Sequence, residues 1–218
     1  MKITLLCSDQ NHPINKYLLH WIAGHKNGHE IALIRSKNNL PGGEILFLIS
    51  CSEIINSHDR SAYKSTLVLH ASNLPQGRGW SPHIWQIISG AEDIVLSLIE
   101  ANDLVDSGRI WQQIKIRVPK HALWNEINDH LFSAELKLID FAVEHFESVT
   151  PISQRTDIEP TYFPKRNPAD SIIDPYASIE SQFDRIRVCD PERFPAYFEL
   201  YEYQYKLTLE KIGKIKTK

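Results

Sequence analysis

Several residue patterns that mark whole classes of protein are missing from this sequence. Only three of its 218 residues are cysteines, and Cys7, Cys51 and Cys189 lie far apart. They form neither a disulfide framework nor a paired metal knuckle, which favours a reducing compartment. The apolar run at residues 3–7 is too short for a signal peptide, and no run approaches the length of a membrane span. We therefore expect a cytoplasmic protein without a membrane partner.

The sequence also lacks an excess of charge of one sign. Its formal net charge of −3 gives no general attraction to phosphate polymers, so nonspecific nucleic-acid binding is not expected. Its histidines lack the Cys or second-His spacing of a zinc site. His25 and His29 are four residues apart, but they flank Gly28 beyond a predicted helix. We predict no metal and no nucleic-acid partner.

A complete nucleotide-binding glycine motif is missing too. Residues 77–79, Gly-Arg-Gly, follow a predicted strand and precede a predicted helix, as the dinucleotide fingerprint does. The third glycine of that fingerprint is absent, and the Gly-Lys-Ser/Thr of a P-loop occurs nowhere in the chain. This motif alone therefore predicts no nucleotide-binding site.

The first 150 residues contain a regular alternation of strands and helices. Short apolar runs predict strands, and apolar residues at intervals of three and four predict helices. The alternation predicts an α/β core with a mostly parallel central sheet. The predicted strands are residues 3–7, 30–35, 44–50, 67–69, 94–100 and 109–116, and the predicted helices are residues 14–23, 80–89 and 121–146.

The composition changes after Val149. Five prolines between residues 150 and 176 predict an extended connector. Residues 183–188 and 197–209 are rich in Tyr and Phe and are interpreted as short strands. We therefore divide the chain into a core, residues 1–150, and a connector with a small β-rich C-terminal subdomain, residues 151–218. That subdomain is a candidate contact for a homodimer.

Two residues with chemical potential follow predicted strands. His70 ends the strand at residues 67–69, a position where open α/β sheets place their ligands, and its imidazole suits proton transfer near neutral pH. Asp106 follows the strand at residues 94–100 and is close enough in sequence to reach the same place. A structural interpretation stays open for both, because His70 suits a buried ring bound to a carbonyl and Asp-Ser-Gly is a common turn.

The motifs around these residues resemble one family. His-Ala-Ser-x-Leu-Pro at residues 70–75, Gly-Arg-Gly-x-x-Pro at 77–82 and Val-Asp-Ser-Gly-x-Ile at 105–110 are similar in order and spacing to the formyltransferases that use 10-formyltetrahydrofolate. The resemblance covers residues 1–150 and implies a Rossmann-like formyltransferase core with 10-formyltetrahydrofolate as cosubstrate. It also implies a folate site at Cys51, Ser52, Glu53, Ile54, Asn102, Asp103 and Leu104.

The catalytic trio of that family is Asn, His and Asp, and this chain matches two of the three. The resemblance gives His70 and Asp106 their catalytic roles, but Val68 stands where the family has Asn. Either the trio is reduced here or another donor replaces the amide. Asn73, predicted as the third catalytic residue, Ser72 and backbone N–H groups are the candidates. A replacement is expected, because losing one such donor costs on the order of 10²–10³ in rate.

The C-terminal segments indicate a branch of the family. Residues 162–171 and 190–199 resemble segments of sugar-nucleotide N-formyltransferases from surface-polysaccharide pathways. Residues 151–218 contain 11 Lys/Arg and 11 Asp/Glu, a poor match to a tRNA backbone. The sequence thus predicts formyl transfer to the primary amine of an amino-sugar nucleotide. Two alternatives stay open: the acceptor is methionyl-tRNA or another amine, or the protein is a degenerate homologue that binds folate or a sugar without catalysis. The predicted substrate-binding residues are Ser72, Arg78, Gly79, Tyr162 and Arg166.

Overall fold

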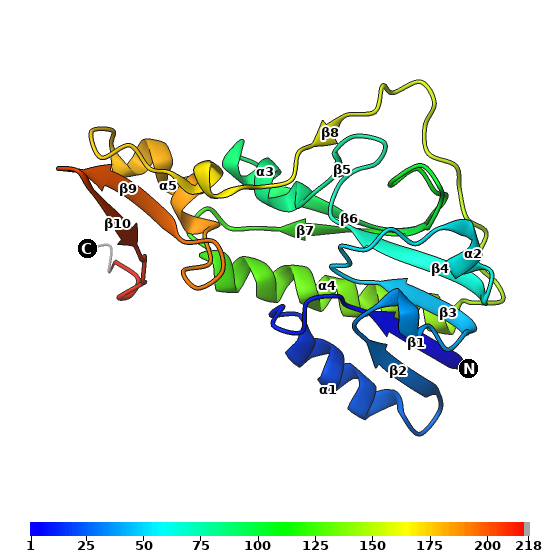
Figure 1. Ribbon diagram of the computed structural model, residues 1–218. Coiled ribbons are helices and arrows are strands. Elements are labelled where there is room, and N and C mark those ends of the chain that lie inside the picture. The colour runs from blue at the N-terminus through cyan, green and yellow to red at the C-terminus, as the bar shows by residue number, and fades with distance from the viewer. Residues whose placement is uncertain (216–218) are drawn as a thin grey trace.

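The protein is built on a six-stranded sheet with the strand order β2-β1-β3-β4-β6-β7 (Figure 1). The computed structural model describes residues 1–215. Strands β1 to β4 pair in parallel, whereas β6 is antiparallel to both of its neighbours. The prediction of a mostly parallel central sheet is therefore confirmed. The strands are β1 (Lys2–Leu6), β2 (Glu30–Ile34), β3 (Gly43–Leu48), β4 (Tyr63–His70), β6 (Asp93–Glu100) and β7 (Ile110–Arg117).

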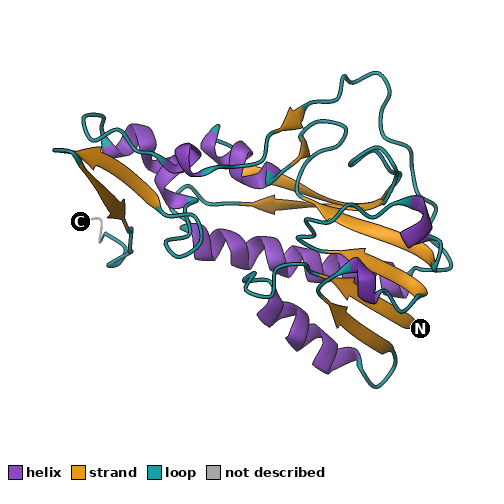
Figure 2. Cartoon of the chain, in the orientation of Figure 1, coloured by secondary structure: helices purple, strands orange, loops and turns teal. Residues whose placement is uncertain are grey.

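Two helices lie side by side along one face of this sheet (Figures 1 and 2). They are α1 (Asn15–His25) and α4 (Trp124–Glu144), which the apolar periodicity of the sequence predicted. Glu126 accepts the Leu123 N–H at 2.8 Å and so satisfies one of the free donors at the start of α4. The remaining helices are α2 (Ser57–Arg60), α3 (Pro82–Ile88), α5 (Ile179–Arg187) and the 3-10 turns η1 (Lys37–Asn39) and η2 (Pro168–Ser171).

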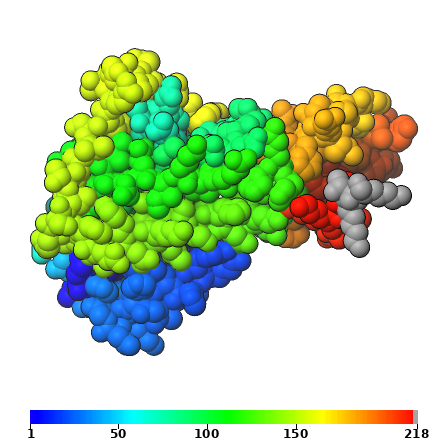
Figure 3. Space-filling model, turned by 180° about the vertical axis from the view of Figure 1, so that it is seen from behind, coloured from blue at the N-terminus to red at the C-terminus, as the bar shows by residue number. Residues whose placement is uncertain are grey.

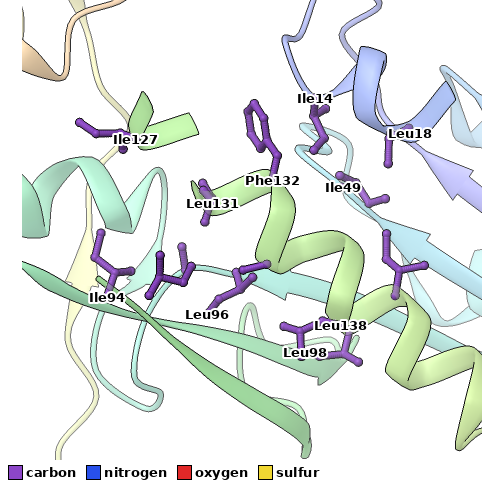
Figure 4. Close-up of a cluster of buried hydrophobic side chains, with 14 of the residues drawn as sticks. Ile14, Leu18, Ile49, Ile94, Leu96, Leu98, Ile127, Leu131, Phe132 and Leu138 are labelled. Atoms are coloured by element: carbon purple, nitrogen blue, oxygen red, sulfur yellow. The ribbon is translucent and has the colours of Figure 1, made fainter. Parts of the chain in front are cut away.

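The core follows from the two-residue period of the strands. Ile3 and Leu5 of β1 pack in the large cluster that contains α1 and α4 (Figure 4), whereas Leu6 faces a smaller cluster on the opposite side. On α4, the predicted apolar positions 127, 131, 134, 138 and 142 are buried, and Phe141 is half-buried. Leu123, also predicted on this face, is buried at the N-cap. Burial on both faces explains why the central strand β3 is a continuous apolar run from Ile45 to Leu48.

The connector pairs with the central sheet and also with the chain that follows His70. Ile152 forms an antiparallel bridge with Ile110 of β7. Residues Tyr162–Phe163 form β8, which runs parallel to β5 (Arg78–Gly79). These two short strands are a separate sheet. The connector therefore contacts the chain directly after His70, which brings residues more than 80 positions apart in sequence to the same place.

The C-terminal part differs from its sequence-based interpretation. Of residues 183–188, interpreted as a strand, residues 183–187 belong to α5 and Val188 is its C-cap. Ile179, Phe183 and Ile186 repeat at helical spacing, and the Ser178 side chain caps the start by accepting the Ser181 N–H at 3.1 Å. The single strand predicted at 197–209 is a hairpin of β9 (Ala196–Leu200) and β10 (Tyr203–Leu207).

Figure 3 shows this C-terminal part, coloured orange to red, at one end of the molecule. Ile173, Ile186 and Val188 nevertheless belong to the same buried cluster as the sheet and α4. Within residues 1–215, no helix is long and apolar enough to cross a membrane.

Candidate functional site

The two residues selected from the sequence lie together in the structure. His70 is the last residue of β4, and its Nδ1 is 3.5 Å from Asp106 Oδ2. The side chains are 6% and 9% exposed. On the other side of the ring, Nε2 is 2.8 Å from the Gly77 carbonyl oxygen. Both ring nitrogens therefore face oxygen atoms that can accept a hydrogen bond.

Asp106 reaches His70 by an indirect path. Since β6 is antiparallel to β4, its carboxyl end at Glu100 lies beside Leu67 and not beside His70. The loop at residues 101–109 folds back along β4 and brings Asp106 to the histidine. There Asp106 Oδ2 also accepts the Gly79 N–H at 2.8 Å, which fixes the carboxylate between the histidine and β5.

The glycines of the loop after β4 are required by its conformation. Gly77 and Gly79 have φ angles of +73° and +97°, which other residues rarely adopt. A Cβ on Gly79 would lie 2.4 Å from the Phe163 carbonyl oxygen. Only glycine allows β5 to approach β8 this closely. Gly79, which the sequence analysis assigned to the substrate, thus contacts the connector and Asp106.

The position of the missing family amide is filled by an apolar side chain. Val68 packs between two small clusters of buried residues, on the same face of β4 as His70. Of the two side chains predicted to replace the amide, Asn73 is exposed, whereas the Ser72 hydroxyl is buried and has no hydrogen-bond partner among the described residues. The geometry favours Ser72 over Asn73 as the additional donor. The catalytic role of Asn73 stays a prediction.

The two segments predicted to bind folate are joined by Arg60. Its guanidinium donates to the Ile55 carbonyl at 2.7 Å and to Asp103 at 2.5 Å. This connects the loop after β3 with the loop after β6. Ile54 and Leu104 are 81% and 59% exposed, so each loop presents an apolar side chain to solvent.

The other predicted folate residues have mainly structural contacts. Cys51 Sγ donates to the Glu53 carbonyl, and the Glu53 carboxylate accepts the Lys37 N–H at 2.8 Å. The Ser52 N–H donates to Ser8 Oγ at 2.9 Å. The Asn102 side chain accepts the N–H of the residue that follows it. Folate binding by these residues stays a prediction.

The predicted substrate residues are divided between the interior and the surface. Arg78 is 6% exposed, and its guanidinium donates to Gln154 Oε1 at 2.8 Å and to the Tyr162 hydroxyl at 3.2 Å. Tyr162 is 57% exposed. Within residues 1–215, Arg78 Nε is buried without a partner, but the buried guanidinium is held by these two contacts, whereas the Tyr162 ring is exposed.

Arg166 is a cation without an anionic partner. It donates to Ser171 Oγ at 2.9 Å, its Nε is buried without a partner, and no carboxylate pairs with it within residues 1–215. Its guanidinium lies 5.6 Å from the centre of the half-exposed Phe194 ring. Arg193 lies against the same ring at 5.5 Å but is paired with Asp9 at 2.7 Å. Arg166 is thus the side chain here that is best suited to receive an anion.

Sequence reasoning missed two histidines in this region. Burial lowers the pKa of His83, on α3, to about 3, and the charge of Arg166 is the next cause. Burial also lowers the pKa of His12 to about 4, with Arg193 contributing. Both rings are neutral at physiological pH. His12 follows β1 at the carboxyl edge of the sheet, a position that could have identified it, but no sequence pattern marked His83.

No metal site is formed by the part of the chain that the structure describes. Among residues 1–215, no group of three or more His, Cys, Asp and Glu side chains is arranged to hold a metal ion. The groups at this site that can take part in chemistry or ligand binding include the His70–Asp106 pair, the buried hydroxyl of Ser72 and the guanidinium of Arg166.

Comparison with known proteins gives matches to one group of enzymes. No family model matches the chain. Methionyl-tRNA formyltransferase from Orientia tsutsugamushi (strain Boryong) is 28% identical over 123 residues, which are 56% of this chain and 40% of that protein. The same enzyme from Kosmotoga olearia is 26% identical over 125 residues, again 40% of that protein. The chain thus matches about two-fifths of the length of these curated relatives.

Solved structures match almost the whole chain. Methionyl-tRNA formyltransferase from Clostridium thermocellum has a TM-score of 0.82 at 22% identity, covering 98% of this chain and 95% of that one. A sugar N-formyltransferase from Shewanella has a TM-score of 0.72 at 14% identity, covering 98% and 99%. HypX from Aquifex aeolicus in complex with tetrahydrofolic acid has a TM-score of 0.74 at 18% identity, covering 94% of this chain and 36% of that one.

At these identities the solved structures show a shared fold. The chain has the Rossmann-like fold of the formyltransferases, as the motifs of its sequence predicted.

Proposed function

We propose that this protein transfers a formyl group from 10-formyltetrahydrofolate to the primary amine of an amino-sugar nucleotide. The observation that carries the proposal is the buried His70–Asp106 pair, with its 3.5 Å contact, in a formyltransferase fold. In the reaction, the neutral amine attacks the formyl carbon, and a tetrahedral intermediate forms. The bond from that carbon to N10 of the folate then breaks, and the proton lost by the amine ends on N10.

His70 is suited to stabilising the developing oxyanion and to assisting the proton transfer in this reaction. Its Nε2 is the ring nitrogen that does not face Asp106, and we expect it to exchange the Gly77 carbonyl for the reacting groups. There it would donate to the developing oxyanion and assist the proton transfer to N10. Asp106 would orient the ring and stabilise its positive charge.

Ser72 is our candidate for the donor that replaces the missing amide. Its buried hydroxyl has no partner and follows His70 by two residues. A buried hydroxyl without a partner is costly, and an oxyanion nearby would satisfy it. The Ser72→Ala variant should therefore lose at least tenfold in kcat, whereas Asn73→Ala, at an exposed side chain, should retain most of its activity.

The surroundings of Arg166 support an amino-sugar nucleotide as the formyl acceptor. A guanidinium without a carboxylate partner is suited to a phosphate or diphosphate group. The exposed Tyr162 and Phe194 rings supply apolar surface for the rest of the ligand. The Shewanella neighbour, which is a sugar N-formyltransferase, agrees with this choice. We accordingly assign the nucleotide diphosphate to Arg166, and 10-formyltetrahydrofolate to the loops that contain Ile54 and Leu104.

A coupled assay tests the proposal. The purified protein would be incubated with 10-formyltetrahydrofolate and a panel of UDP- and dTDP-amino sugars, and release of tetrahydrofolate and a formyl mass increase would be followed. Turnover of one sugar that collapses in His70→Ala supports the proposal. Binding of folate without turnover of any amine refutes it, and then Val68 indicates a degenerate binding homologue.

Methionyl-tRNA is the second candidate acceptor, since the curated relatives are methionyl-tRNA formyltransferases. The equal numbers of basic and acidic residues in 151–218 argue against it. Added methionyl-tRNA should leave the sugar reaction unchanged. If it is formylated, or if it competes with the sugar nucleotide, the tRNA interpretation replaces the sugar interpretation.

A further inference from the structure

The conformation of Asp106 requires support from outside its own loop. Its φ angle is +53°, in the left-handed region that is unfavourable for a residue with a side chain. Within the loop, the hydrogen bonds from the Ser107 N–H and hydroxyl to the Leu104 carbonyl, at 3.3 and 2.7 Å, are local. They do not determine where the loop lies relative to His70. The Gly79 N–H holds the carboxylate itself, and a further contact is needed to hold the backbone of this loop relative to β5.

Gln154 in the connector provides that contact. Its Nε2 donates to the Asp106 carbonyl at 2.8 Å and to the Gly108 carbonyl at 2.9 Å. Both protons of one amide group therefore bind the backbone on either side of Ser107. The remaining atom, Oε1, accepts from Arg78 at 2.8 Å. The Gln154 amide therefore makes three hydrogen bonds within the protein, two through Nε2 and one through Oε1.

The contact with Arg78 links Gln154, β5 and Asp106 in a closed ring of hydrogen bonds and backbone. Arg78 and Gly79 form β5, which is held to the connector by the Arg78 N–H donating to the Thr161 carbonyl at 2.9 Å. The Gly79 N–H in turn donates to Asp106 Oδ2. Gln154 thus joins the two segments that hold Asp106: the loop that contains it and the strand that binds its carboxylate.

We propose that Gln154 is a positioning residue for catalysis, which holds Asp106 at His70 by joining the loop at 101–109 to Arg78. The proposal rests on the proposed formyl transfer for its kinetic consequence, but its structural part does not. Gln154 has no contact with the catalytic histidine and acts through Asp106. A displacement of about 1 Å in such a group lowers kcat by as much as about 100-fold, so we expect a loss of 10- to 100-fold without Gln154.

Hydrogen exchange at β5 tests the structural part without any substrate. The Arg78 and Trp80 N–H groups donate to carbonyls of the connector, whereas the Gly79 N–H between them donates to the Asp106 carboxylate. In Gln154→Met, which keeps the length of the side chain but has no polar atoms, exchange at Gly79 should become about tenfold faster. Exchange at Arg78 and Trp80 should change much less, which gives an internal reference.

The chain offers a matched control at Gln182. Its Nε2 donates to the Asp174 and Ser178 carbonyls at 3.0 and 3.3 Å, and its Oε1 accepts the Asp174 N–H at 2.7 Å. It is also half-buried, but it lies on α5 and has no contact with the site. Gln182→Met should lower the melting temperature by a similar amount and leave both Gly79 exchange and kcat unchanged.

A second variant separates folding from positioning. Gln154→Glu keeps an acceptor for Arg78 but places a carboxylate against the carbonyls of Asp106 and Gly108. We expect it to be folded and to show the same loss of kcat as Gln154→Met, with the KM for 10-formyltetrahydrofolate little changed.

The outcomes are distinguishable. If wild-type protein formylates no amine, the proposed function fails, while fast Gly79 exchange in both Gln154 variants still supports the structural role. If Gly79 exchange in the Gln154 variants equals that of the wild type, or if Gln182→Met reduces kcat equally, the proposal is overturned.

Discussion

Glu135 predicts an unusual dependence of stability on pH. It lies on the buried face of α4, 7% exposed, and its Oε2 has no hydrogen-bond partner. Burial raises the pKa of this carboxyl from its usual 4.5 to about 8. Between these two values the folded state holds a proton that the unfolded state has lost. The free energy of unfolding contributed by this group therefore falls as pH rises from 4.5 to 8.

The size of the effect follows from the pKa. Each pH unit in this window costs about 1.4 kcal/mol, so the wild type should lose about 2–3 kcal/mol of stability through Glu135 between pH 5 and pH 7. Glutamine has nearly the same shape but carries no charge at any pH. The stability of the Glu135→Gln variant relative to that of the wild type should therefore rise by about 2–3 kcal/mol between pH 5 and pH 7.

Urea unfolding at pH 5, 6, 7 and 8 measures this difference, because contributions from all other titrating groups are common to both proteins. Glu144, exposed near the end of the same helix, supplies a control: Glu144→Gln should follow the wild type at every pH. If the stabilities of Glu135→Gln and the wild type differ by a constant amount across the range, the carboxyl is not buried in its neutral form and the reasoning is refuted.

Three further predictions concern the site. Gly79→Ala should destabilise the protein more than Gly90→Ala in thermal unfolding. Both glycines have φ near +90°, but only a Cβ at Gly79 would meet the Phe163 carbonyl. Equal losses of stability would contradict this. Arg166→Met should raise the KM for the sugar nucleotide at least tenfold and leave the KM for folate unchanged; a change in both would assign it a structural role. His70→Asn should lower kcat by about 10²–10⁴ without weakening folate binding in a titration, and retained turnover would exclude His70 as the proton-transfer group.

The core of the fold could be predicted because its signal is local. Buried strands such as β1 and β3 are continuous apolar runs, and the long helix α4 repeats its apolar residues over 21 positions. Short segments are ambiguous, because in six residues a two-residue and a 3.6-residue period differ little. For this reason residues 183–188 were assigned to a strand, whereas they form the end of the nine-residue helix α5 and its C-cap.

The site was predicted in part. His70 and Asp106 were found because their motifs have a characteristic order and spacing, and the structure brings them together. Ser72 was among the predicted donors, but the catalytic role was predicted for Asn73, because a sequence alone does not distinguish a buried hydroxyl from an exposed amide. Gln154 was missed, since it lies in a connector with no periodicity and no motif.

The sequence by itself determined the elements of the sheet, the alternation of strands and helices, and the chemical identity of the His–Asp pair. Only the tertiary structure decided how these parts meet. The antiparallel direction of β6, the return of the loop at 101–109 to His70, and the joining of Gln154 to Arg78 all depend on contacts between residues 25 to 85 positions apart. Such contacts depend on the packing of the whole chain, and no local pattern of residues encodes them.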